Sequence, residues 1–87
     1  MKVKDYGGRE HDVFSVSVEA DRDGRGEVYF YVMGKTRGDC GSVKTCCIDV
    51  FRGLQELDAA LDLQQEIRSG RRKEQEAALE KARELQP

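Results

Sequence analysis

One stretch of eight residues, Gly26 to Met33, constrains the fold of this chain more than any other. As an extended strand it carries apolar or aromatic side chains on both faces, with Val28, Phe30 and Val32 on one and Tyr29, Tyr31 and Met33 on the other. Such residues are typical of strands, and a strand with two apolar faces needs cover on both. We therefore predict the central strand of a small sheet.

A second strand is predicted before it, from Asp12 to Ala20. Its apolar side chains occupy every second position, which is typical of a strand with one buried face and one wet face: Phe14, Val16, Val18 and Ala20. The Asp23-Gly24 pair in the following connection favours a hairpin, since glycine accepts positive φ at little cost.

A third strand is predicted from Val43 to Phe51, after a glycine-rich loop over residues 34–42. Alternation would turn Cys46, Ile48 and Val50 toward the core. Residues 2–6 would add a fourth strand at one edge. The result is an antiparallel meander of three strands, or of four if that edge strand forms.

The spacing of apolar residues becomes helical after Gly53. Leu54, Leu57 and Leu61 form one stripe, which predicts a helix over residues 53–68 that covers one face of the sheet. Residues 71–86 are strong helix formers with only a thin apolar strip: Ala78, Leu79, Ala82 and Leu85. Ser69-Gly70 either separates two helices or lies inside one. We expect a single α+β domain over residues 1–87, with its sheet at about 12–51.

Composition excludes several classes of protein. Fifteen basic and seventeen acidic residues give a net charge of -2, whereas general nucleic-acid binders carry a basic excess. No apolar run approaches the roughly 20 residues of a membrane-spanning helix, and the first residues lack the apolar core of a signal peptide. Three cysteines are an odd number, which favours reduced thiols. We expect a cytoplasmic protein with no membrane partner.

The chemical motifs are weak, so we predict no enzyme, no cofactor and no metal. Gly34-Lys35-Thr36 resembles the end of a phosphate-binding loop, but Tyr29 stands where that motif needs glycine, and no helix follows. Cys40, Cys46 and Cys47 lack the paired spacing of zinc ligands. His11 is the only histidine, and nothing in the sequence places it beside a thiol that it could activate.

The acidic side of the first helix is the most informative feature. Residues 53–67 contain no lysine and no arginine, while Asp58, Asp62 and Glu66 follow one another at four-residue intervals. Carboxylates at that spacing repel, so a helix selected only for stability would interleave lysines. The stripe is either a surface for a basic partner or an ordinary solvated face with an acid near the helix start.

Two other groups of residues are candidate binding sites. Tyr29 and Tyr31 lie on the second face of the central strand, which so short a chain covers poorly, and exposed aromatics favour a protein partner or a homodimer. Four cations could contact phosphate, although they also suit a solvated helix face: Arg68, Arg71, Arg72 and Lys73.

In its size and its lack of catalytic motifs, the chain is similar to the small inhibitors that phages and mobile elements encode against bacterial defence systems, anti-CRISPR proteins among them. The resemblance implies a non-catalytic protein-binding module whose acidic surface occupies a nucleic-acid-binding site. Asp58, Asp62 and Glu66 would then mimic nucleic acid, and we expect Tyr29 and Tyr31 to lie beside this acidic helix as further contacts. The alternative is a small nucleic-acid-binding or regulatory protein that uses residues 68–73.

Overall fold

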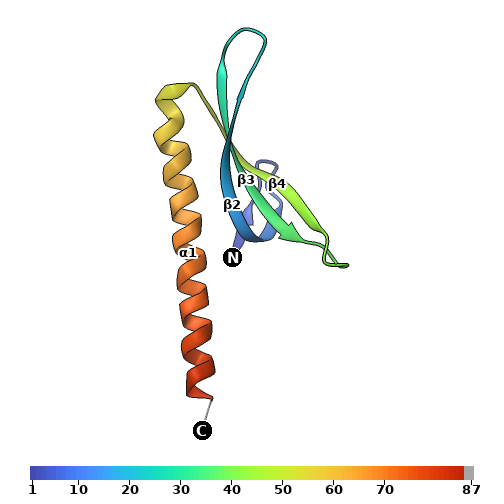
Figure 1. Cartoon of the computed structure of the whole chain (residues 1–87), viewed down its shortest axis with the longest axis vertical. Coiled ribbons are helices and arrows are strands. Elements are labelled where there is room, and N and C mark those ends of the chain that lie inside the picture. The colour runs from blue at the N-terminus through green and yellow to red at the C-terminus, as the bar shows by residue number, and fades with distance from the viewer. Residues whose placement is uncertain (86–87) are drawn as a thin grey trace.

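The computed structural model describes residues 1–85 of the chain. Its elements are β1 (Lys2–Lys4), β2 (Glu10–Arg22), β3 (Val28–Arg37), β4 (Val43–Arg52), a 3₁₀ turn η1 (Leu54–Glu56) and α1 (Leu57–Glu84). The strands pair antiparallel in the order β1-β2-β3-β4, and α1 lies against the sheet (Figure 1). The predicted α+β class and the four-stranded form of the meander are confirmed.

The core lies between α1 and the face of the sheet that carries Phe30 and Val32. From α1, Ala60 and Ile67 are buried against it, with 0% and 3% of their surface exposed. β2 contributes Val13 and Val16 to the buried set, and β4 contributes Ile48. The core is thin, since Val13 and Val32 are its largest fully buried side chains.

A β-bulge in β2 changes which side chain enters the core. The pairing of β2 with β3 shifts between Val13 and Ser15, which turns Val13 inward. Phe14 is half-buried instead, with the guanidinium of Arg37 4.5 Å from the centre of its ring. The buried position predicted for Phe14 is taken by Val13, because alternation does not continue through a bulge, while Phe14 lines a hollow beside α1.

A second bulge has the same effect in β4. The register between β3 and β4 shifts between Val32 and Met33, so that Phe51 pairs with Phe30 and packs against the core. Val50 pairs with Tyr31 and lies on the opposite face of the sheet. The prediction that Val50 faces the core is wrong for the same reason.

The helical region is one continuous helix of 28 residues that runs through Ser69-Gly70. Gly70 lies where Met1 packs onto the helix, and a Cβ at this position would lie 2.6 Å from Cε of Met1. This close contact gives the glycine a packing role within one helix. The predicted second helix reached Gln86, which lies outside the described residues.

The molecule is elongated. Its extents are 62 × 30 × 18 Å and its radius of gyration is 15.9 Å, whereas a compact domain of this length has a radius of gyration of about 12 Å. The cause is α1, whose C-terminal half continues past the end of the sheet (Figure 1). α1 is nevertheless too polar to span a membrane.

Candidate protein-interaction surfaces

Asp58, Asp62 and Glu66 form an exposed row on α1. By helical geometry they lie on the side of α1 opposite to Ala60 and Ile67, about 6 Å apart along the helix axis. Within residues 1–85, none of the three carboxylates forms an ion pair or a side-chain hydrogen bond. We call these three residues the acidic stripe.

Carboxylates of the sheet and its loops contrast with the acidic stripe, because most of them have partners within the fold. Asp5 lies 2.7 Å from Nε2 of His11, and that hydrogen bond lowers the pKa of the Asp5 carboxyl. Asp23 accepts hydrogen bonds from the N–H groups of Arg25 and Glu27 at the hairpin turn. The acidic stripe therefore has its hydrogen-bonding capacity directed at solvent, where a partner can reach it.

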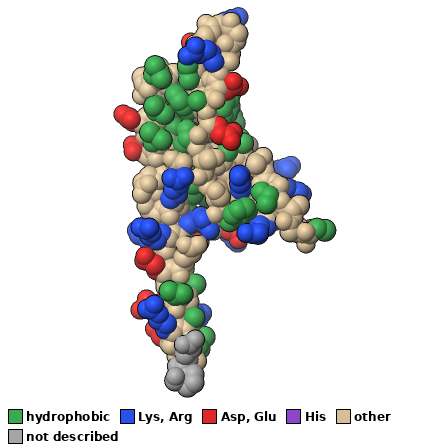
Figure 2. Space-filling view, viewed as in Figure 1, with side chains coloured by type: hydrophobic (Ala, Val, Ile, Leu, Met, Phe, Trp, Pro, Cys, Tyr) green, Lys and Arg blue, Asp and Glu red, His purple; other side chains and the backbone are tan. Residues whose placement is uncertain are grey.

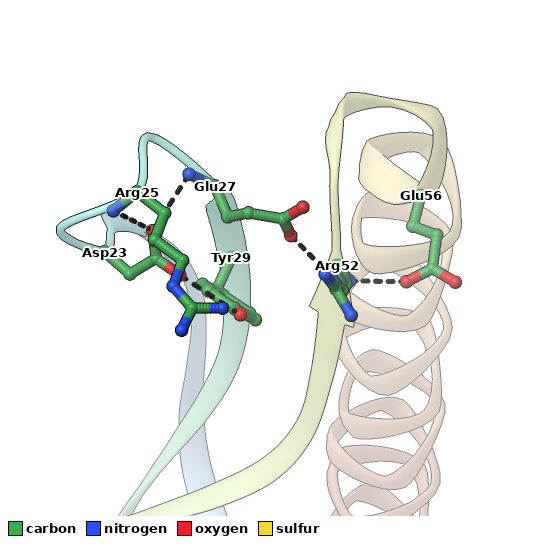
Figure 3. Close-up of polar contacts among 6 residues, drawn as sticks. All are labelled: Asp23, Arg25, Glu27, Tyr29, Arg52 and Glu56. Carbon is green, nitrogen blue, oxygen red and sulfur yellow. Dashed lines mark hydrogen bonds and ion pairs between the residues drawn. The ribbon is translucent and has the colours of Figure 1, made fainter.

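Arg52 fixes the start of the acidic helix relative to the sheet (Figure 3). Its guanidinium donates to Glu27 at the base of the hairpin, and its backbone N–H donates to Glu56 in η1. The pair lowers the pKa of Glu27 and raises that of Arg52. Gly53 then turns the chain with a φ of 83°, while its N–H donates to the Val28 carbonyl at 2.8 Å.

Tyr29 and Tyr31 lie on the face of the sheet that points away from α1. Their ring centres are 6.5 Å apart, both rings are half-buried, and the Tyr29 hydroxyl donates to Asp23 at 3.4 Å (Figure 3). α1 covers the Phe30 and Val32 face. The tyrosines and the acidic stripe are thus on opposite sides of the molecule, and the prediction that they lie beside each other is wrong.

The predicted basic cluster is only partly assembled. Arg68, Arg71 and Arg72 line a hollow of ≈290 Å³, and Lys73 does not line it. Arg68 also donates to the Val16 carbonyl at 3.3 Å, which ties this arginine to β2. Arg37 from β3 and Arg71 both line a neighbouring hollow of ≈400 Å³. The sequence did not predict that they lie close together, because they are 34 positions apart. Figure 2 shows lysine and arginine side chains across the middle of this face.

Two leucines that the helical pattern placed in the core are exposed. Leu54 lies in η1 with 71% of its surface exposed, and Leu61 has 43% exposed, because Ala60 and Ile67 form the centre of the buried face. Figure 2 shows hydrophobic side chains gathered on the half of the molecule away from the C-terminus. The helical spacing of the leucines predicts an apolar stripe, but it does not predict that Leu54 and Leu61 remain exposed.

The thiols of β4 are poor nucleophiles. Burial raises the pKa of both Cys46 and Cys47, and the nearby Asp5 carboxylate acts in the same direction. A raised pKa keeps a thiol protonated at neutral pH. Among the described residues, no three His, Cys, Asp or Glu side chains are placed to hold a metal ion.

Two backbone groups of β4 form hydrogen bonds outside the pairing with β3. The Cys47 carbonyl accepts from the Tyr6 N–H at 2.8 Å, and the Val50 N–H donates to the Asp49 side chain at 2.8 Å. Side-chain and loop contacts of this kind protect a sheet edge against added strands.

Comparison of the chain with models of known families, with curated proteins and with solved structures finds no match.

Proposed function

We propose that this protein is a non-catalytic protein-binding module that presents the acidic stripe to a basic surface of its partner. The observation that carries the proposal is that these three exposed carboxylates have no ion pair or side-chain hydrogen bond within the described chain and lie in a segment, residues 53–67, without lysine or arginine. Arg52, by contrast, binds Glu27 at the base of the hairpin and Glu56 at the start of the same helix.

The energetics favour a charged partner. Neighbouring carboxylates of the stripe repel by about 0.2–0.5 kcal/mol per pair. A basic surface removes that repulsion, speeds encounter and disfavours acidic partners. A row of negative charges on a rigid helix is also what a nucleic-acid-binding site would accept in place of phosphates. We therefore propose an inhibitor of the kind that phages and mobile elements encode, directed at a bacterial defence complex.

The test compares two triple charge reversals on the same helix. Asp58→Lys/Asp62→Lys/Glu66→Lys removes the stripe, and Glu76→Lys/Glu80→Lys/Glu84→Lys is its matched control. Both sets have the same four-residue spacing, and both change the net charge from -2 to +4, by two units at each of three positions. We expect the first variant to lose partner binding and the second to retain it within a few fold.

Two outcomes would contradict the proposal. In one, the stripe variant keeps its affinity for the partner. In the other, both variants lose affinity equally, which would mean that only the net charge matters. Far-UV circular dichroism must show equal helix content, because a lysine in the first turn of α1 is less favourable to the helix dipole.

A second candidate function is binding of a phosphate backbone, and one observation favours it. Arg37 from β3 lines the same hollow as Arg71 of α1, while Arg68 and Arg72 line the hollow next to it. Four guanidinium groups from two elements thus lie around adjoining depressions. Four charges are few for tight backbone binding, so this function ranks second.

A further inference from the structure

A notch lies between the C-terminal half of α1 and the end of the sheet. It is the hollow of ≈400 Å³, walled by Arg71, Gln75 and Ala78 on the helix side and by Met1 and Phe14 on the sheet side. Beyond it, Ala82 and Leu85 continue the same side of α1 on which Ala60 and Ile67 are buried. Leu85 has 78% of its surface exposed. The core-facing side of the helix therefore continues where the sheet no longer covers it.

The chain exposes more surface than a compact domain of its mass. The chain exposes 6723 Å², about 1,500 Å² more than the roughly 5,200 Å² expected of a compact monomer of this mass. A typical specific interface covers about 800 Å² on each partner. This surplus belongs to the whole elongated chain, and the end of α1 that projects past the sheet contributes part of it (Figure 1).

We propose that this surface binds a second copy of the same chain, with the two C-terminal halves of α1 antiparallel about a two-fold axis near Ala78. A small side chain on the axis lets the two helices approach closely. With that axis, Leu85 of each chain lies opposite Arg71 of the other, at the partner's notch. Each exposed leucine would then be buried in the hollow that the other chain leaves open.

The charges along the strip fit this pairing. Glu74 and Lys81 are two turns apart on one edge of the strip, so the antiparallel arrangement places Glu74 of one chain beside Lys81 of the other. Glu74 also lies 3.2 Å from the Met1 ammonium of its own chain, and its side chain is 59% exposed. A second cation can therefore reach it. This self-complementarity favours a second copy over an unrelated partner.

The proposed dimer is independent of the proposed function, since the acidic stripe lies on the other side of α1. In the dimer both acidic stripes remain exposed. The assembly would present two copies of the partner-binding surface, which increases avidity wherever a target offers two sites.

The test is the solution mass of the full chain by sedimentation equilibrium over a range of concentrations. We expect the wild type to approach twice its 9.8 kDa. Ala78→Glu brings two carboxylates together at the axis, which should weaken dimerisation roughly 100-fold. Ala77→Glu is the matched control, because it makes the same change on the neighbouring residue but on the outer side of α1. It should change dimerisation by less than about threefold.

Both alanines are exposed in the single chain, so neither substitution removes a core contact, and circular dichroism should confirm equal helix content. A wild-type monomer at every concentration would overturn the proposal, as would equal effects of the two substitutions. Loss of the dimer on Tyr31→Ser, with Ala78→Glu harmless, would also overturn it and assign the interface to the tyrosine face. The acidic-stripe variant should dimerise normally, which separates failure here from failure of the proposed function.

Discussion

Val13 packs directly against Gly34 in the sheet, where a Cβ on residue 34 would lie 2.8 Å from Cγ1 of Val13. Cδ1 of Ile48 and Sγ of Cys46 would lie 3.1 and 3.2 Å from the same Cβ position. Gly34 is thus a core residue of β3, which accounts for the glycine in Gly34-Lys35-Thr36 without any phosphate.

The first prediction concerns this contact. Gly34→Ala should destabilise the protein by about 1–3 kcal/mol, because a methyl group has to displace buried side chains that cannot swing away. Urea denaturation followed by circular dichroism measures the change. Gly24→Ala is the control, since nothing lies within 4 Å of its Cβ position. Equal effects of the two substitutions would contradict the packing role of Gly34.

The same contact shows how far the sequence predicts the fold. Alternation and helical periodicity identified the strands and the helix, because both patterns record burial on one face. They could not reveal the two bulges, which bring Val13 and Phe51 to the core and turn Val50 to the other face. A bulge adds one residue to a strand without an obvious mark in composition.

The candidate sites were predictable to different degrees. The acidic stripe follows from spacing alone, and its exposure matches the expectation. The position of Tyr31 relative to that stripe depends on which sheet face α1 covers, and both faces of β3 are apolar. The proximity of Arg37 to Arg71 depends on how two distant elements pack. Local sequence patterns carry neither kind of information.

The second prediction concerns the hairpin turn. Asp23→Ala removes the acceptor of the Arg25 and Glu27 N–H groups, at 2.8 and 3.0 Å, and of the Tyr29 hydroxyl. Amide hydrogen exchange at Glu27 should become roughly fivefold faster, as expected for the loss of one hydrogen bond of ordinary strength. Asp39→Ala, in the exposed β3–β4 loop, should leave that exchange rate unchanged. Unchanged exchange in Asp23→Ala would show that the turn holds without its side chain.

The third prediction is a loss of stability in acid. Hydrogen bonds from His11 and Arg52 lower the pKa values of Asp5 and Glu27 from 3.8 and 4.5. Their contribution is therefore complete above those ordinary values and is lost as the pH falls through the lowered ones. The melting temperature should fall below about pH 4, and Asp5→Asn/Glu27→Gln should show a smaller fall. If this variant showed the same acid transition as the wild type, the loss of stability in acid would come from other carboxylates.

The fourth prediction tests the second candidate function. If the arginines contact phosphate, Arg71→Gln/Arg72→Gln should weaken binding of a single-stranded oligonucleotide and reduce the slope of log K against log salt by about 1.4. Fluorescence anisotropy at several salt concentrations gives both values. Lys81→Gln/Arg83→Gln removes the same charge from α1 outside the two hollows. Equal effects of the two variants would exclude a specific phosphate site at the cluster.

The most direct test of the protein-binding function is an affinity pull-down of the tagged chain from a bacterial lysate, with and without nuclease, analysed by mass spectrometry. We predict one stoichiometric protein that survives nuclease treatment and is lost with Asp58→Lys/Asp62→Lys/Glu66→Lys. Recovery that depends on intact nucleic acid would contradict the proposed function and favour the arginine cluster instead.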